Sequence, residues 1–500
     1  MKIEETYNQL VRPGFVDNIK KIGIDAVFTS AKGDYLYYND DQQRVFDFIS
    51  GYGTGILGHN NPRLIEYAQK ALQNNTVFQG QRSVRKNAAI LADKLNRIMK
   101  DSTGEDYVFQ FANTGAEANE IALKHAFMEK KWEDKKIINN TEEAALMLES
   151  IEDEEKKHQL AAQLEHNRQV LSETKVLVGM MDGFHGKTTG TLKVSYAFGL
   201  KYMLDYLNIR TLFIDTYSIA DLEEKSKDLE RTVYYFQEKK GILEAVCHRY
   251  TPAVAYFAEP ILGDGGVIEL QVEFAKRMRD ICSNMNVPLI FDEIQCGMGR
   301  TGRFLESEYL GVYADYYCLS KALGGAISKN SVCAISQRRF VKEFGFIHSS
   351  TFNEDDYSCG ISCEVLNILF ENEGRLIKTC QEKGAYIHQE LLKVQKKYPE
   401  LILEVRGKGL MQGFVIDNTL AADFAQLTDV AYINLVEGYL FKHGYRVGTT
   451  LTSGAVIRLE PSVYITEEEI NTFMKVLSRL GELIKNKDYN VLVTEVTGNE

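Results

Sequence analysis

Two short apolar runs that end abruptly in charged side chains constrain the fold of this chain most. The first run, residues 289–291, ends in Asp292, and the second, residues 316–319, is followed by Lys321 after one serine. Short apolar runs of this kind are typical of buried parallel strands. Open α/β sheets bind their ligands at the edge where the parallel strands end. We therefore expect a carboxylate and a lysine to face one ligand from neighbouring strands.

A lysine and an acid at one sheet edge suit pyridoxal 5'-phosphate (PLP). This cofactor needs a lysine amine for its Schiff base and an acid against its pyridine nitrogen. The acid keeps the ring protonated, so that the ring accepts the electrons of a substrate carbanion. Taken separately, the two pieces also fit a solvated Asp-Glu strand end and a lysine on a glycine-rich loop.

The full motifs around these residues resemble one family. DEIQCGMGRTG, from residue 292, followed by SKALGG, from residue 320, resembles the signature of class III (ω-amino acid type) PLP-dependent aminotransferases of fold type I. The resemblance implies that Asp292 pairs with the pyridine nitrogen and that Lys321 carries the Schiff base. It also implies that Gln295 lies near the phenolic oxygen of the cofactor.

A phosphate site is expected where residues 107–112, an apolar run, lead through Asn-Thr-Gly-Ala into a helix. A strand, a turn of small residues and a helix N-terminus bind anions through backbone N–H groups and the helix dipole. By the family resemblance, the amides of Gly115 and Ala116 hold the cofactor phosphate, with the Thr114 side chain nearby. Taken alone, the same segment is a capped helix start.

Three more segments follow the order of the family. The resemblance implies that Phe184 stacks on the pyridine ring, with His185 beside it, and aromatic rings suit such a flat partner. It makes Glu259 an acid near Gln295 and the substrate, although Glu259 also fits a cap of its own loop. It assigns Thr351 to the cofactor phosphate of the other subunit, which implies a homodimer.

Two residues are candidate substrate contacts. Tyr52 follows the first glycine of GYGTGILGH, the segment that lines the substrate entrance in the family, although an ordinary packed tyrosine fits as well. Arg458 matches the arginine of the last family motif and suits a substrate carboxylate, because a guanidinium forms bidentate pairs with carboxylates. A surface salt bridge is the other interpretation of Arg458. The usual Pro-Pro of that motif is here Glu460-Pro461.

Length, charge and cysteines narrow the class further. Five hundred residues exceed what one core usually serves, so we expect two domains. The net charge of −12 argues against nucleic-acid binding. The opening residues lack the apolar core of a signal peptide, and no apolar run is long enough for a membrane span. The eight cysteines lack metal-ligand spacing, so we expect reduced thiols, no metal site and a cytoplasmic location.

The expected fold class is α/β. The large PLP-binding domain, residues 60–345, should have a mostly parallel sheet of the seven-stranded type. A smaller α+β domain would combine residues 1–59 with residues 346–500. Residues 129–174 are rich in Glu, Lys, Ala and Leu and predict one or two exposed helices inserted into the large domain. Residues 217–250 predict another charged helical stretch.

The assembled motifs indicate an aminotransferase. By the resemblance, it moves a distal or α amine from an amino acid to a 2-oxo acid such as 2-oxoglutarate or pyruvate, through a Schiff base on Lys321. Small-molecule amino and oxo acids would be its substrates. A PLP-dependent racemase or aminomutase on the same scaffold stays open. So does a non-catalytic interaction protein that uses the insertion at residues 129–174.

Overall fold

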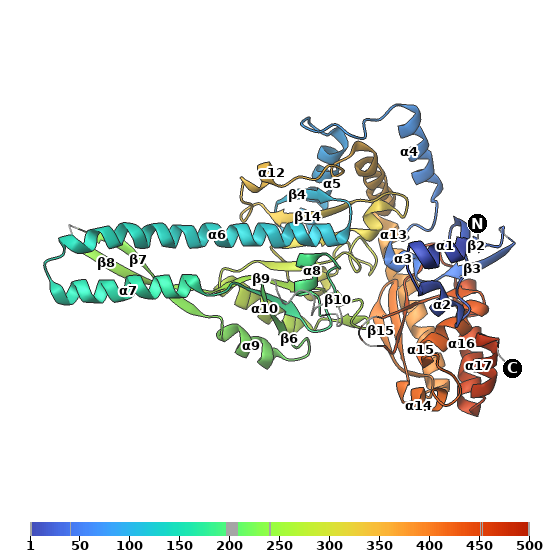
Figure 1. Ribbon diagram of the computed structural model, residues 1–500. Coiled ribbons are helices and arrows are strands. Elements are labelled where there is room, and N and C mark those ends of the chain that lie inside the picture. The colour runs from blue at the N-terminus through green and yellow to red at the C-terminus, as the bar shows by residue number, and fades with distance from the viewer. Residues whose placement is uncertain are drawn as a thin grey trace.

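The computed structural model describes residues 3–40, 42–196, 209–239, 242–450, 452 and 454–498. A seven-stranded sheet with the strand order β4-β14-β13-β12-β9-β5-β6 lies at its centre (Figure 1). β14 runs antiparallel to both its neighbours, and the other pairs are parallel, so the expected mostly parallel sheet is confirmed. The strands are β4 (Tyr107–Ala112), β5 (Val176–Met180), β6 (Arg210–Ile214), β9 (Ala253–Ala258), β12 (Leu289–Asp292), β13 (Tyr316–Leu319) and β14 (Ser331–Ser336).

Both faces of this sheet are buried. Phe291 of β12 belongs to the core on one face, together with helix α10 (Val272–Asn284). Ile290 belongs to the core on the other face, which helix α6 (Gly115–Met147) covers. The strand is therefore a continuous apolar run rather than an alternating one. The remaining elements around the sheet are α4 (Pro62–Gln73), α5 (Lys86–Thr103), α8 (Thr189–Val194), α9 (Ile219–Lys227), β10 (Ile261–Leu262), β11 (Ile268–Glu269), α11 (Ser307–Leu310), η3 (Lys321–Gly324) and α12 (Phe344–Ile347).

A second sheet, with the order β15-β16-β19-β18, lies in the C-terminal part of the chain and is antiparallel throughout. Helices of the same part pack around it, beginning with the long α13. These elements are α13 (Asp356–Lys397), β15 (Ile402–Lys408), β16 (Met411–Ile416), η4 (Asn418–Leu420), α14 (Ala421–Phe424), α15 (Tyr432–Lys442), β17 (Tyr445–Arg446), β18 (Gly448–Thr449), β19 (Val456–Leu459), α16 (Glu467–Asn486) and α17 (Tyr489–Thr497).

The N-terminal segment joins this C-terminal part through a third sheet. Its elements are α1 (Ile3–Leu10), α2 (Phe15–Lys20), β1 (Phe28–Lys32), β2 (Tyr35–Tyr38), β3 (Gln43–Asp47) and α3 (Ser50–Gly53). β2 and β3 form an antiparallel hairpin, and β3 pairs in parallel with β17. The two ends of the chain are therefore built into one unit, beside the large sheet (Figure 1).

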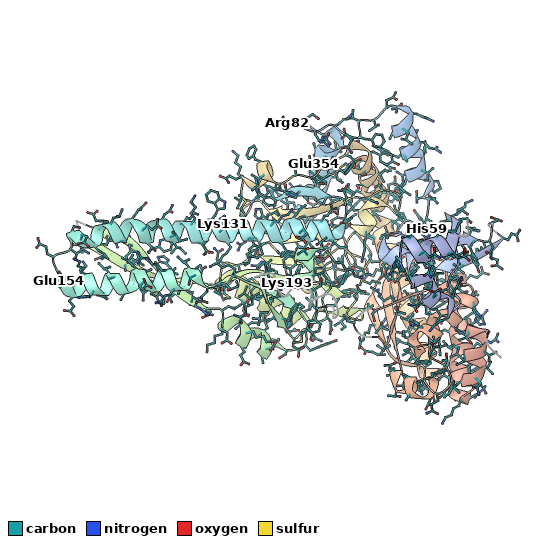
Figure 2. All side chains as sticks on the ribbon, in the orientation of Figure 1. His59, Arg82, Lys131, Glu154, Lys193 and Glu354 are labelled. Carbon is teal, nitrogen blue, oxygen red and sulfur yellow. The ribbon has the colours of Figure 1, made fainter. Side chains whose placement is uncertain are left out.

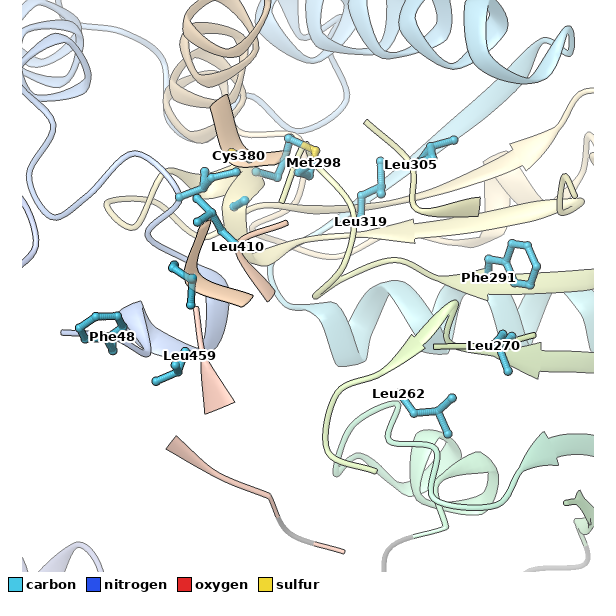
Figure 3. Close-up of a cluster of buried hydrophobic side chains, with 14 of the residues drawn as sticks. Phe48, Leu262, Leu270, Phe291, Met298, Leu305, Leu319, Cys380, Leu410 and Leu459 are labelled. Atoms are coloured by element: carbon cyan, nitrogen blue, oxygen red, sulfur yellow. The ribbon is translucent and has the colours of Figure 1, made fainter. Parts of the chain in front are cut away.

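One cluster of buried side chains runs from the large sheet into the smaller unit (Figure 3). It contains Phe291 from the large sheet, Phe48 from the N-terminal segment and Leu410 and Leu459 from the C-terminal part, each 0% exposed. Burial of one such side chain stabilises a fold by roughly 1.5–3 kcal/mol. The shared cluster therefore fixes the two units against each other.

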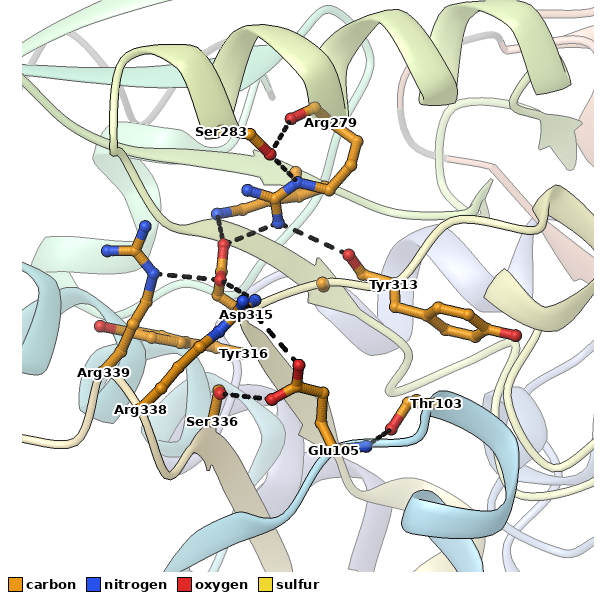
Figure 4. A network of polar contacts seen from close by, with 12 residues as sticks. Thr103, Glu105, Arg279, Ser283, Tyr313, Asp315, Tyr316, Ser336, Arg338 and Arg339 are labelled. Carbon is orange, nitrogen blue, oxygen red and sulfur yellow. Dashed lines mark hydrogen bonds and ion pairs between the residues drawn. The ribbon is translucent and has the colours of Figure 1, made fainter.

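A network of ion pairs around Asp315 connects β12 and β13 at the N-terminal ends of these strands (Figure 4). Asp315 is buried just before β13, and its carboxylate accepts a hydrogen bond from the backbone of Leu289 at 2.9 Å. Arg279, Arg338 and Arg339 form ion pairs with the same carboxylate. Burial raises the pKa of Asp315, but the facing guanidinium groups outweigh it, and the pKa is lowered overall.

A long arm projects from the large sheet (Figures 1 and 2). It consists of the second half of the 33-residue α6, then η1 (Leu148–Ser150), α7 (Glu154–Ser172) and a hairpin of β7 (Arg231–Lys239) and β8 (Ile242–Tyr250). Two apolar clusters of its own, which include Phe236 and Tyr250, hold it together. None of the described helices, α6 included, is long and apolar enough to cross a membrane.

The helical prediction for residues 217–250 is wrong for most of that stretch. Helix α9 ends at Lys227, and the described residues from Arg231 to Tyr250 form the β7-β8 hairpin. The prediction rested on the charged residues. The aromatic and β-branched run from Thr232 to Phe236 has strand propensity, and its packing against α6 and α7 decides the structure.

Candidate active site

A buried carboxylate with three hydrogen-bond donors lies at the end of β12. The Oδ2 atom of Asp292 accepts from Asn119 Nδ2 at 2.7 Å and from His185 Nδ1 at 2.9 Å, while Oδ1 accepts from the Ile294 N–H at 3.1 Å. The exposed fraction of Asp292 is 4%. Because a carboxylate accepts hydrogen bonds, the proton of His185 lies on Nδ1. These contacts orient Asp292 and stabilise its charge.

His185 extends this network away from the carboxylate. It is fully buried, and its Nε2 has no hydrogen-bond partner among the described residues. Burial lowers the pKa of His185, but the hydrogen bond and charge of Asp292, with the charge of Glu259, outweigh it and raise the pKa. The Asn119 amide also bonds the His185 carbonyl at 2.8 Å, so it fixes both groups at once.

Lys321 follows β13, the neighbour of β12, and opens η3. Its φ of 40° lies in the left-handed region, which residues other than glycine rarely adopt. Backbone strain of this kind is common at functional sites, where the surrounding structure stabilises the strained conformation. Burial lowers the pKa of the Lys321 amine, which favours the neutral, nucleophilic form. The predicted lysine and carboxylate thus lie on adjacent parallel strand ends.

The N-terminus of α6 provides free backbone donors. No described residue accepts a hydrogen bond from the N–H groups of Gly115 and Ala116. The Thr114 hydroxyl and the Glu117 carboxylate form a capping box, so this hydroxyl is engaged within the cap. A Cβ on Gly115 would lie 2.7 Å from Ile294 Cδ1, so a larger residue here would displace the Ile294 side chain.

A loop after β5 presents Phe184, whose ring is only partly buried. Glu259, at the end of β9, holds this loop: its carboxylate accepts from the N–H groups of Phe184 at 2.8 Å and Gly263 at 3.3 Å. The loop-capping interpretation of Glu259 therefore describes its contacts here. Burial raises the pKa of this carboxyl.

Gln295 has a partner that the sequence did not indicate. Its Nε2 donates to Glu460 Oε1 at 2.6 Å, and Glu460 is 0% exposed. The second oxygen of Glu460 has no hydrogen-bond partner among the described residues. The departure from the Pro-Pro of the family marked this position in the sequence, but not its role.

Arg300 is a second buried residue to which the sequence assigned no role. Its guanidinium donates to the carbonyls of Leu410, Pro461 and Gly53, which belong to three distant parts of the chain. Arg300 therefore connects Gly53 of the N-terminal segment to Leu410 and Pro461 of the C-terminal part. Asn119 was missed in the same way, although it lies one helical turn after Gly115.

Arg458 is not a surface residue. It is 3% exposed, and its Nη2 pairs with Asp264 Oδ1 at 2.8 Å and donates to the Thr449 carbonyl at 2.8 Å. Its guanidinium lies 4.7 Å from the ring centre of Tyr52, whose φ is 57°. The structure thus brings both candidate substrate residues together. Asp264 pairs with Nη2 of the guanidinium, whereas its Nε has no hydrogen-bond partner among the described residues.

Thr351 lies apart from these groups in the single chain. Its side chain is exposed, and its carbonyl accepts from Gln81 Nε2 at 2.9 Å. This loop and the segment around Arg82 run side by side at the surface (Figure 2).

The donor set fits PLP. Asp292 provides a buried, oriented acid, and Lys321 provides a buried amine. The start of α6 provides two free N–H groups for a phosphate. The accessible Phe184 offers an aromatic face to the ring. Parallel strands that carry this set at their ends define the class: a fold type I PLP-dependent transferase.

Comparisons with known proteins give the family. The model of aminotransferase class-III matches residues 19–480, and the chain belongs to that family. It is 28% identical to acetylornithine aminotransferase of Nostoc sp., over 87% of this chain and 85% of that protein. It is 26% identical to diaminobutyrate–2-oxoglutarate transaminase of Marinococcus halophilus, over 92% of each chain.

The structure is similar to the ornithine aminotransferase of Toxoplasma gondii. The TM-score is 0.72 at 22% identity, with 97% of each chain covered, and this likeness concerns the fold. The predicted family, fold class and PLP dependence are confirmed, and the protein is an aminotransferase that acts on small molecules.

Proposed function

We propose that this enzyme takes the amine from an amino acid at Lys321 and transfers it to a 2-oxo acid such as 2-oxoglutarate or pyruvate. The single observation that carries the proposal is the position of Lys321 and of the oriented carboxylate of Asp292 at the ends of two adjacent parallel strands. The similarity to diaminobutyrate–2-oxoglutarate transaminase supports this acceptor.

In this proposal each residue has a distinct task. Asp292 would hold the pyridine nitrogen, Phe184 would stack on the ring with His185 beside it, and Gln295 would serve the phenolic oxygen. Thr114, Gly115 and Ala116, at the start of α6, would hold the phosphate. When bound, PLP supplies an electron sink for the carbon that carries the amine. Lys321 Nζ, whose pKa is lowered by burial, takes the proton from that carbon and returns one in the reverse direction.

The Arg458–Asp264 pair suggests which amine reacts. Asp264 already pairs with one terminal nitrogen of Arg458 at 2.8 Å, so a donor carboxylate bound at this guanidinium would share it with a buried acid. A distal amine avoids this, because its carboxylate lies farther away. A 2-oxo acid, whose carboxylate adjoins the reacting carbon, would displace Asp264. Glu259 and Tyr52 would border the substrate on either side.

We also propose a homodimer in which the partner subunit's Thr351 reaches the cofactor phosphate. Apolar side chains gather on the two segments that meet at Thr351, where Gln81 and Arg85 bond the loop carbonyls. Their exposed fractions are 57% for Val77, 94% for Val84, 81% for Phe346, 71% for Ile347 and 62% for Phe352. An exposed patch of this kind marks an interaction site.

The domain division that we propose has residues 60–345 as the large domain. Residues 1–59 and 346–500 would form the small one, as the β3-β17 pairing supports. We place the enzyme in the cytoplasm, which the eight free cysteines support.

An absorbance scan of the PLP-loaded enzyme during addition of single amino donors tests the function. The proposal expects one donor to bleach the visible band, and a 2-oxo acid to restore it. Lys321→Ala should abolish both responses, whereas Lys329→Ala, on the same loop, should keep them. A donor converted to its enantiomer without any oxo acid would indicate a racemase instead.

A further inference from the structure

The β7-β8 hairpin of the arm (Figure 1) has one strand edge that is covered and one that is free. The Asn167 side chain bonds both backbone groups of Tyr234 in β7, and the Asn140 side chain bonds both of Phe236. These bonds lie on the side of β7 that faces away from β8. Side chains of α6 and α7 therefore satisfy the outer edge of β7.

The free edge belongs to β8, a strand of nine residues. Tyr234 lies opposite Cys247, and Phe236 lies opposite Ala245. In an antiparallel ladder, two opposite residues point their backbone groups either both toward each other or both away. The N–H and C=O groups of Cys247 and Ala245 therefore point away from β7, as do those of every second residue along β8. No described residue bonds these outward groups.

A free edge of this kind is a template for another strand, and proteins usually block it with lysine, proline or a bulge. β8 has none of these: its sequence from Ile242 to Tyr250 lacks lysine and proline, and its pairing with β7 is regular throughout. The same arm thus blocks the edge of β7 and leaves the edge of β8 open. An open, regular edge suits recognition by strand addition.

The side chains of β8 are complementary to a second copy of the same strand. A two-fold axis through Val246 sets all nine residues opposite residues of the other copy. Glu244 of one copy then faces His248 of the other. Arg249 faces the apolar Leu243. No two like charges face each other in this register, and like charges directly opposite would be destabilising.

We propose that β8 is an interaction surface for β8 of a second copy, in antiparallel pairing centred on Val246. The contact is isologous, and the two hairpins join into one continuous sheet. Nine residues from each copy are fewer than the roughly 20–30 residues a side of a stable interface, so the contact is weak. We expect dimers in dilute solution and associated dimers at high concentration. This inference does not depend on the proposed reaction.

Oxidative cross-linking tests the register. In a Cys247→Ser background, Val246→Cys sets the new thiols of the two copies opposite each other in a non-hydrogen-bonded pair, where Cα atoms about 4.5 Å apart allow a disulfide. Non-reducing electrophoresis of concentrated, oxidised protein should then show linked pairs of chains, because the remaining cysteines are buried.

Glu244→Cys in the same background is the matched control. It lies on the same face of β8 but opposite His248, so its thiols stay apart and should not link. Absence of linked chains in the Val246→Cys protein, or equal linkage in both proteins, would overturn the pairing.

A proline at the edge tests the contact in solution. Ala245→Pro removes an outward N–H group that β7 does not use, so the hairpin keeps its own ladder. Sedimentation velocity at increasing protein concentration should show that wild type and Ala245→Ser associate beyond the dimer. Association of Ala245→Pro should be weaker by about tenfold or more. With β7 still protected from hydrogen exchange, equal association of Ala245→Pro and wild type would overturn the proposal. So would a wild type that stays dimeric throughout.

Discussion

At the scale of single residues, Asn119 shows how the site depends on a neutral side chain. It donates to the Asp292 carboxylate and to the His185 carbonyl, and so positions both. A hydrogen bond to a charged group is worth about 1.5–3 kcal/mol. We expect Asn119→Ala to weaken PLP binding by at least tenfold, as measured by titration of the apoenzyme with PLP. Asn139→Ala, on an exposed face of α6, is the control. Equal PLP affinity in both variants would contradict this role.

Glu460 is expected to act on Lys321 through its charge. After burial, which lowers the pKa of Lys321, the charge of Glu460 is the largest influence and raises it. Glu460→Gln removes that charge while its amide oxygen still accepts from Gln295. We therefore expect the pH midpoint of the visible cofactor absorbance to move to lower pH, as followed in a spectroscopic titration. An unchanged or higher midpoint would exclude this coupling, and Glu482→Gln provides the control.

Glu293 makes stability depend on pH. Its carboxyl is 0% exposed, and burial raises its pKa from 4.5 to about 8, although the N–H groups of Glu306 and Ser307 bond it. Between these two values the folded state binds more protons than the unfolded state. The free energy of unfolding therefore falls as pH rises through this window, by at most about 1.4 kcal/mol per pH unit.

Urea unfolding of wild type and Glu293→Gln at several values between pH 5 and pH 8 measures this effect. The variant should show a smaller loss of stability across the window, because its side chain does not titrate. Glu373→Gln, at an exposed position, should keep the wild-type slope. Parallel slopes for wild type and Glu293→Gln would rule out the titration of Glu293.

The sequence indicated some residues of the site and not others for a physical reason. Asp292 and Lys321 stand at the ends of apolar runs, and local pattern places them at the ligand edge. Asn119 and Glu460 act across 173 and 165 residues of chain, through contacts that exist only after the sheet and the smaller unit assemble. No local pattern encodes such a contact.

At the scale of elements, the arm shows how helices protect the edge of a strand. Asn140 of α6 bonds both backbone groups of Phe236, and Asn167 of α7 bonds both of Tyr234. His166 also bonds the carbonyl of Thr232 at 3.0 Å. These side chains take the place of a further strand along β7 and so block pairing with another chain.

The two asparagines should stabilise the arm specifically. We expect Asn167→Ala to leave the Tyr234 backbone groups without partners, at a cost of about 1–3 kcal/mol. Hydrogen exchange should then accelerate in β7 and α7 but not in β12, and activity should persist. Asn139→Ala serves again as the matched control on α6. If hydrogen exchange stayed slow throughout β7 in Asn167→Ala, the hydrogen bonds of Asn167 to Tyr234 would not stabilise the arm.

Whether a segment forms a helix or a strand could be predicted where one sequence pattern dominated. Residues 129–174 are largely helical, as their composition predicts, in α6 and α7. The β7-β8 hairpin was missed because its charged residues resemble a helix surface, whereas its inward residues, Val233 and Phe236, find their apolar partners on α6 and α7. Tertiary packing decides such segments, not local propensity.

At the scale of the whole molecule, the shared buried core and the exposed apolar patch around Thr351 have different roles. The core joins residues from both ends of the chain to the large sheet, so a single chain orders its own Asp292 and Lys321. The patch around Thr351 remains uncovered on that chain, with the side chains of Phe346 and Phe352 largely exposed. A complete cofactor site therefore requires a second copy under the proposed assembly.

Substitution within this patch tests the assembly. Phe346→Glu places a charge on the exposed apolar surface, and charge desolvation at an interface is costly. We expect light scattering to show a monomer where wild type is a dimer. PLP affinity should fall by about tenfold or more, since the phosphate loses the partner subunit's Thr351. Leu146→Glu, at an 83% exposed residue of the arm, should remain dimeric with unchanged PLP affinity. A dimeric Phe346→Glu variant with wild-type PLP affinity would place the interface elsewhere, whereas a monomer that binds PLP as tightly as wild type would remove Thr351 from the cofactor site.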